Sequence, residues 1–125
     1  MQTLRVATFD GPGTSPQLRS VPRPEVPDRA ALIRIEACGV CGTDLHILRG
    51  HWPKPLPWPL TLGHELAGVI EEIGPALEKD FMGQPLSVGD KVMLPPLMPC
   101  GECFYCIHYP DRANRCLNPT YYGRY

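Results

Sequence analysis

The sequence predicts a mainly β protein, built as a small barrel or sandwich from five or six short strands. The chain has 125 residues, which suits one domain with a hydrophobic core of its own. Its sixteen prolines and twelve glycines are together about twice the average share, which favours turns and short strands over long helices. Hydrophobic and polar residues also alternate in several short segments, which is the period of a half-buried strand.

Three strands are expected in the first third of the chain. "TLRVATF" (3–9) is the first, with Leu4 and Val6 on one face, and "QLRSV" (17–21) is a short second strand after a turn-rich loop. "ALIRIEA" (31–37) is the clearest strand, because its residues alternate between two faces over seven positions.

A short helical segment and two more strands follow. "TDLHILRG" (43–50) predicts one or two helical turns with Thr43 as the N-cap, whereas the alternating prolines of residues 51–60 require an extended chain. "ELAGVIEEIG" (65–74) predicts another strand, and "SVGDKVMLPP" (87–96) predicts a turn and then a strand. The side chains expected on one face of the strand at 65–74 are Ala67, Val69 and Ile73.

Charge and hydropathy indicate which compartment and which classes of partner are expected for the protein. Twelve basic and thirteen acidic residues give a net charge of −1, so nothing indicates a nucleic-acid or membrane-surface partner. No apolar stretch is long enough for a signal peptide or a membrane span. The expected compartment is therefore the cytoplasm, where thiols stay reduced.

The stretch "CGECFYCIHYPDRANRC" holds four of the six cysteines, spaced C-x2-C-x2-C-x9-C. A ferredoxin motif would close with C-x3-C-P, which is absent, and disulfides need an oxidising compartment. Zinc accepts four thiolates in a tetrahedron, so the pattern predicts a structural zinc site that organises an otherwise irregular tail. The four predicted ligands are Cys100, Cys103, Cys106 and Cys116.

Two other ligand sets are weaker alternatives. His108 could replace one of the four thiolates, although an exposed loop histidine fits it better. A zinc ribbon could instead combine the C-x2-C pairs at residues 38–41 and 100–103, but the segment between them is far longer than the usual ~15–20 residues.

A second group of chemically suggestive residues lies in "CGVCGTDLH" and "GHELAGVIEEIG", namely Cys41, His46, His64 and Glu65. Cys41 and His64 could each donate one bond to a second metal ion. A catalytic zinc typically has two or three protein ligands and one open position. A small buried thiol and a core histidine explain the same residues equally well, so the spacing alone leaves both interpretations open.

Four ordered motifs resemble the N-terminal half of the zinc-containing medium-chain dehydrogenases, the alcohol dehydrogenase family. They are "GVCGTDLH", "GHELAGVIEEIG", "VGDKV" and the C-x2-C-x2-C lobe with a later cysteine. The resemblance covers essentially the whole chain. It implies a GroES-like, partly open β-barrel with a zinc-binding lobe, divided into a barrel core at 1–95 and a lobe and tail at 96–125.

The resemblance also implies a role for each site residue. Cys41 and His64 would bind a catalytic zinc, with Glu65 beside it or alternating as a ligand. Asp44 would orient the imidazole of His64. Thr43 would hydrogen-bond the substrate oxygen, and His46 would pass the proton towards solvent. The four cysteines of the lobe would bind a structural zinc.

The implied activity is zinc-dependent oxidation of a small alcohol, or reduction of a carbonyl, with NAD or NADP as hydride carrier. The implied assembly is a homodimer or homotetramer. Candidates for the substrate wall are Trp52, Trp58, Pro96 and Leu97. A non-catalytic zinc-binding module with the same fold is the alternative, but it would not need the proton relay of Thr43 and His46.

The sequence departs from the family pattern at three points. The last lobe spacing is x9, where x7 is common, and Cys38 is not at a ligand position, so it is expected to be a small packed thiol. The chain contains no G-x-G-x-x-G fingerprint of a dinucleotide-binding domain. In this family the third protein ligand of the catalytic zinc lies beyond residue 125. The sequence is therefore expected to be an inactive fragment of a longer enzyme.

Overall fold

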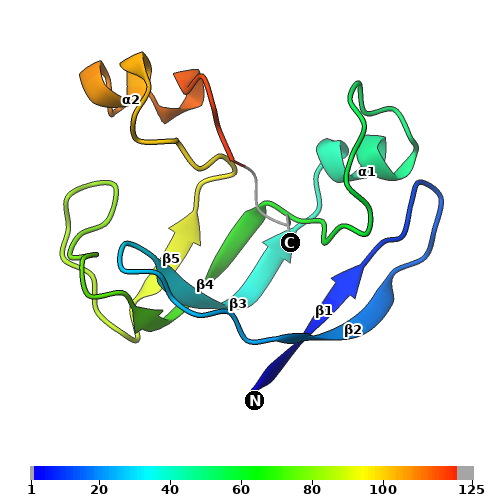
Figure 1. The fold of residues 1–125 in the computed structure, drawn as a ribbon, viewed down its shortest axis with the longest axis horizontal. Coiled ribbons are helices and arrows are strands. Elements are labelled where there is room, and N and C mark those ends of the chain that lie inside the picture. The colour runs from blue at the N-terminus through cyan, green and yellow to red at the C-terminus, as the bar shows by residue number, and fades with distance from the viewer. Residues whose placement is uncertain (1, 121–125) are drawn as a thin grey trace.

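The structure, a computed structural model, describes residues 2–120. Figure 1 shows a central sheet, a separate hairpin beside it, and two short helices beyond one end of the sheet. The elements in chain order are β1 (Thr3–Thr8), β2 (Gln17–Pro22), β3 (Ala31–Gly39), α1 (Gly42–Leu48), β4 (Glu65–Ile73), β5 (Lys91–Leu94), α2 (Phe104–His108) and the 3-10 turn η1 (Ala113–Arg115).

The strands form two antiparallel sheets, a hairpin of β1 and β2 and a three-stranded sheet in the order β3-β4-β5. The mainly β prediction is confirmed, and the described strands do not close into a complete barrel. Because neighbouring strands are antiparallel, β3 and β5 end where β4 begins. Gly39 pairs with Glu65 and Leu66 with Leu94 at this end, so the segments holding both groups of candidate ligands leave the same end of the sheet.

Two hydrophobic side chains form the most buried part of the described core, Ile70 at 2% exposure and Leu60 at 6%. Ile70 follows Val69 directly on β4, so the two side chains lie on opposite faces of the strand, and Ala67, Val69 and Ile73 share the face of Val69, as expected. At Gly68 a Cβ would overlap the backbone oxygen of Arg34, so β3 and β4 approach each other closely at this position.

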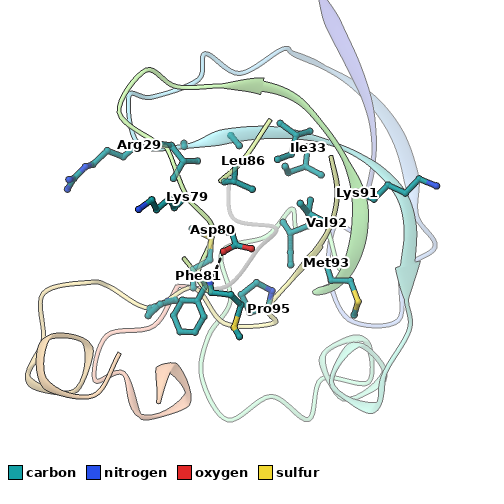
Figure 2. Close-up of a pocket in the computed structure, with 18 of the residues that line it drawn as sticks. Arg29, Ile33, Lys79, Asp80, Phe81, Leu86, Lys91, Val92, Met93 and Pro95 are labelled. Carbon is teal, nitrogen blue, oxygen red and sulfur yellow. Dashed lines mark hydrogen bonds between the residues drawn. The ribbon is translucent and has the colours of Figure 1, made fainter. Parts of the chain in front are cut away.

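A hollow of about 850 Å³ opens on the concave side of the three-stranded sheet. In Figure 2, Ile33 of β3, Val92 of β5 and Leu86 lie around it, whereas the long side chains of Arg29 and Lys91 point away on opposite sides. The wall contributed by the loop between β4 and β5 is held by Asp80, whose Oδ1 accepts hydrogen bonds from the backbone N–H groups of two following residues at 2.9 and 2.7 Å.

Helix α1 begins two residues earlier than the sequence suggested, with Cys41 and not Thr43 as the N-cap. The cause is Asp44, the third helical residue, whose Oδ2 accepts the backbone N–H of Cys41 at 3.0 Å. The loop after β1 anchors the other end of the helix, because the N–H of Gly13 donates to the carbonyl oxygen of Leu48 at 2.7 Å.

The segment from Cys100 onwards forms a lobe that is less irregular than predicted, because it contains α2 and η1. A pair of backbone hydrogen bonds between Met98 and Thr120, at 2.8 and 2.9 Å, closes its base. The predicted boundary between barrel core and lobe at 95/96 stays a prediction, and residues 121–125 of the predicted tail lie outside the described part. No helix of the described residues is long and apolar enough to cross a lipid bilayer.

Candidate metal centres

The four cysteines of the lobe converge on one point. Their sulfur atoms all lie within 4.8 Å of one another, and two of the separations are 3.5 Å, from Cys103 to Cys106, and 3.9 Å, from Cys100 to Cys106. Four thiolates around a tetrahedral zinc at ~2.3 Å would be spaced by roughly 3.8 Å. The donor set and its spacing therefore fit a closed zinc site.

Local backbone geometry places these sulfurs. Gly101 has a φ of 78°, which makes the tight turn after Cys100. Cys103 is the N-cap of α2, and Cys106 lies within that helix. Backbone N–H groups also point at the sulfurs: that of Cys103 donates to Cys100 Sγ at 3.4 Å, and that of Cys100 donates to Cys116 Sγ at 3.2 Å.

The pKa values of the lobe thiols diverge because the thiols share one small site. The backbone N–H groups of Leu117 and then Cys106 lower the pKa of Cys103 to about 6. Burial, and hydrogen bonding with the neighbouring thiols, raise the pKa of Cys106 to about 12. Thiolate-stabilising N–H groups around crowded sulfurs are the arrangement that a metal cation completes by displacing the remaining protons.

The second group consists of Cys41, Asp44 and His64, whose ligand atoms also lie within 4.8 Å of one another. Cys41 Sγ is 3.1 Å from His64 Nε2, although the two residues are twenty-three positions apart. Tetrahedral bonds to one zinc would separate a sulfur and a nitrogen by about 3.6 Å, so a small outward movement accommodates the ion. The arrangement offers two protein ligands and leaves other coordination positions open.

Asp44 holds this second group together and is 5% exposed. Its Oδ2 accepts the N–H of Cys41 at 3.0 Å, and its Oδ1 accepts the N–H of Gly63 at 3.3 Å. The same Oδ1 lies 3.6 Å from Nδ1 of His64, the ring nitrogen that faces away from the sulfur. One buried carboxylate thus joins both chain segments that supply ligands and faces the ring nitrogen that is turned away from the metal position, as carboxylates behind zinc-binding histidines do.

The other predicted site residues lie near this group without joining it. Glu65 is exposed and packs against Gly39, where a Cβ would come within 2.5 Å of its Oε2. Thr43 lies in the first turn of α1, and His46 is exposed in the last turn. No hydrogen bond joins Thr43 to His46 in the part of the chain that the structure describes.

The alternatives for the cysteines are decided by this geometry. Among residues 2–120, Cys41 belongs to one group, Cys100 and Cys103 belong to the other, and Cys38 belongs to neither, which contradicts the zinc ribbon. His108 is exposed at the end of α2 and is not part of the four-cysteine group. Cys38 is exposed rather than packed, although its sulfur lies against Gly63; burial, and then the charges of Asp44 and Glu65, raise the pKa of its thiol.

A second cavity has a volume of about 440 Å³, and Cys41, Asp44 and His64 are not among its lining residues. It lies between the proline-rich segment and the residues after Cys116, and Trp52, Leu60 and Leu117 are among its walls. Ile47 also lines it, one helical turn after Asp44 and therefore on the same side of α1. Sequence reasoning missed this wall, apart from Trp52. Pro96 borders the larger hollow instead, and neither cavity is lined by Trp58 or Leu97.

Comparisons with known proteins agree with these features. Residues 27–124 match the family model of the alcohol dehydrogenase GroES-like domain. An alcohol dehydrogenase of Geobacillus stearothermophilus is 46% identical over 92 residues, which cover 73% of this chain and 26% of the relative. The chain therefore spans about a quarter of the length of that relative.

Solved structures give the same result. An alcohol dehydrogenase from Thermotoga maritima superposes with a TM-score of 0.79 at 30% identity, covering 98% of this chain and 33% of the other. A protein assigned as a zinc-binding dehydrogenase from Sinorhizobium meliloti 1021, bound to NADP, gives a TM-score of 0.75 at 32% identity, with 98% and 33% covered. The GroES-like, partly open barrel is thereby confirmed, and the chain belongs to the alcohol dehydrogenase family, of which it carries the zinc-type GroES-like domain.

Proposed function

We propose that this domain holds the catalytic zinc of an alcohol dehydrogenase through Cys41 and His64 and that the lobe holds a second, structural zinc. The observation that carries the proposal is the separation of 3.1 Å between Cys41 Sγ and His64 Nε2, with the carboxylate of Asp44 behind the imidazole. The lobe offers four thiolates and no open position, which is the composition of a structural site.

The reaction we propose is the reversible oxidation of a small alcohol, with NAD or NADP as the hydride acceptor. The NADP-bound neighbour supports this class of cofactor. Bound zinc would supply Lewis-acid chemistry, which lowers the pKa of a substrate hydroxyl towards neutrality. The sulfur of Cys41 and Nε2 of His64 would hold the ion, and Glu65, an exposed carboxylate at the start of β4, would lie beside it or alternate as a ligand.

The residues of α1 would move the proton. Thr43, in the first turn, would accept a hydrogen bond from the substrate hydroxyl and take its proton as it passes its own on to His46. His46 is exposed in the last turn of the helix, so it can release the proton to water. Asp44 would keep His64 in the tautomer whose Nε2 is free to bind metal.

The carbon chain of the substrate would occupy the second cavity, with Trp52 as one wall. A volume of about 440 Å³ suits a small organic molecule. Trp52→Ala should therefore improve turnover of bulky alcohols relative to ethanol, by roughly 10-fold for a change worth about 1–3 kcal/mol in an apolar pocket.

We also propose a cytoplasmic homodimer or homotetramer for the enzyme that contains this domain, which analytical ultracentrifugation would test.

Cobalt binding tests the proposed catalytic site directly. The lobe is first filled with Zn²⁺, Co²⁺ is then added, and the thiolate-to-cobalt absorption band is recorded. The band should appear in the unaltered chain and disappear in Cys41→Ser, while His108→Ala, which removes an exposed histidine outside both groups, should keep it. A band that survives Cys41→Ser would contradict the assignment of the catalytic metal.

A further inference from the structure

The C-terminus of α1 carries an arrangement that the proposed reaction does not use. The N–H of Gly50 donates to the carbonyl oxygen of Ile47 at 3.0 Å, and the N–H of His51 donates to that of His46 at 2.9 Å. With Gly50 at a φ of 74°, these two bonds form a Schellman motif. This motif places the side chain of the residue after the glycine against the last turn of the helix, and here both of the facing side chains are histidines.

The two imidazoles are close and exposed. Their ring centroids lie 6.2 Å apart, with an angle of 45° between the ring planes. Both residues are exposed, so a solvated ion can reach them. Their backbone is fixed, because the loop after β1 packs on the same helix end, with Pro12 against Gly50. Two donors on a rigid turn lose little freedom when they bind one ion.

The spacing fits a shared metal ion. An imidazole nitrogen binds zinc at ~2.0–2.1 Å, which puts the metal roughly 3.2 Å from the centroid of each ring. Two rings on one ion therefore have centroids about 5 Å apart for a tetrahedral angle and about 6.4 Å for a linear arrangement. The observed 6.2 Å is about 1 Å longer than the tetrahedral spacing, and small side-chain rotations would close this difference.

We propose that His46 and His51 form a two-histidine site for a divalent transition-metal ion such as Ni²⁺ or Zn²⁺, separate from both cysteine-containing groups. Imidazole is a ligand that suits these ions, and water would fill the remaining positions. A metal ion bound to His46 would prevent its imidazole from accepting a proton. If His46 has the role given to it under the proposed function, added metal ions would therefore inhibit the enzyme. The metal site itself does not depend on that function.

Nickel titration of the full chain, followed by NMR, tests the site without measuring activity. The chain is labelled with ¹⁵N and loaded with Zn²⁺, and paramagnetic Ni²⁺ is added. Amide signals of residues 46–51 should broaden before those near His108. In His51→Gln the Ni²⁺ concentration needed for half-broadening of these signals should rise about tenfold or more, because two-point binding becomes one-point binding. His108→Gln, the same change at a single exposed histidine, should leave it unchanged.

Two results would overturn the site. One is an unchanged response of residues 46–51 in His51→Gln. The other is broadening that begins around His64 or the lobe and reaches residues 46–51 only at the concentrations that affect His108. Neither result would bear on the cobalt test of Cys41, so failure of this site and failure of the proposed function are distinguishable. The amide spectrum of His51→Gln without Ni²⁺ shows whether the helix end is intact.

Discussion

The two groups of candidate metal ligands lie beyond the same end of one sheet, but they are built in opposite ways. The lobe takes all four donors from seventeen consecutive residues and closes its own base between Met98 and Thr120. The other group joins Cys41 to His64 across twenty-three positions and depends on the buried Asp44 to hold the two segments together. A local, closed set of donors suits a structural ion, and a long-range, open set suits a catalytic one.

Breaking the lobe should give the largest effect. Cys116→Ser removes one of the four thiolates, and the binding free energy of a structural zinc, on the order of 10 kcal/mol in small zinc peptides, is also folding free energy. We expect residues 98–120 to become sensitive to protease while the three-stranded sheet keeps its amide protection from hydrogen exchange. Loss of protection in β3 and β4 as well would show that the lobe is not an independent unit.

In the group of Cys41, Asp44 and His64, here called the open group, substitutions nearby should instead change the rate of the reaction. In a dehydrogenase that carries this domain, Thr43→Val should lower turnover by roughly 10²-fold or more, the usual scale for losing proton-transfer catalysis. Thr43→Ser keeps the hydroxyl and should stay active. His46→Gln should cost less, shift the pH dependence of turnover and be partly rescued by small diffusible bases, because His46 only hands the proton to solvent. If the pH dependence of turnover is unchanged in Thr43→Val and in His46→Gln, Thr43 and His46 have no part in proton transfer and are ordinary residues of the helix.

The next largest effect is expected at Asp44, whose carboxylate joins the two segments of the open group. Asp44→Asn should weaken metal binding at Cys41 and His64 by about 10–100-fold, the typical cost of losing a carboxylate that orients a metal-binding histidine. The cobalt band of the open group reports this affinity, and the lobe, which contains no such carboxylate, serves as the internal control. Equal weakening of both metal centres would mean that Asp44 supports the fold rather than the ligand.

The smallest effect is expected at Cys38. Here the change from cysteine to serine, the same as in Cys116→Ser, replaces an exposed thiol. Cys38→Ser should change the free energy of unfolding by no more than about 0.5 kcal/mol, as is usual for an exposed position. Chemical denaturation of the zinc-loaded chain measures it. A cost as large as that of Cys116→Ser would mean that the contact between the Cys38 sulfur and Gly63 carries much of the stability of the open group.

The contrast between the two regions also explains how far the sequence alone leads. The lobe is predictable because its information is local: C-x2-C spacing brings sulfurs together whatever the rest of the chain does. The strands are predictable for the same reason, since alternation is visible within a few residues. For Cys41 and His64, spacing left the question open, and only the family resemblance suggested the pair that the structure brings together.

Features that depend on tertiary contacts were not predictable from local pattern. The N-cap of α1 moves from Thr43 to Cys41 because a carboxylate reaches back over one turn, and propensity alone does not resolve such a choice. The close approach of β4 to the backbone of β3 at Gly68 is likewise a tertiary contact, which the alternation of apolar side chains does not reveal. Helix α2 is too short for a periodic signal, and its N-cap is Cys103, one of the four cysteines of the lobe.

Zinc retention by three chains tests the division of labour between the two metal centres most directly. The unaltered chain, Cys41→Ser and Cys116→Ser are each loaded with Zn²⁺, dialysed against a mild chelator and analysed for metal. We predict that the unaltered chain and Cys41→Ser each keep about one zinc ion, held by the closed four-thiolate lobe, and that Cys116→Ser keeps none. Loss of the retained zinc in Cys41→Ser, with retention in Cys116→Ser, would contradict the account.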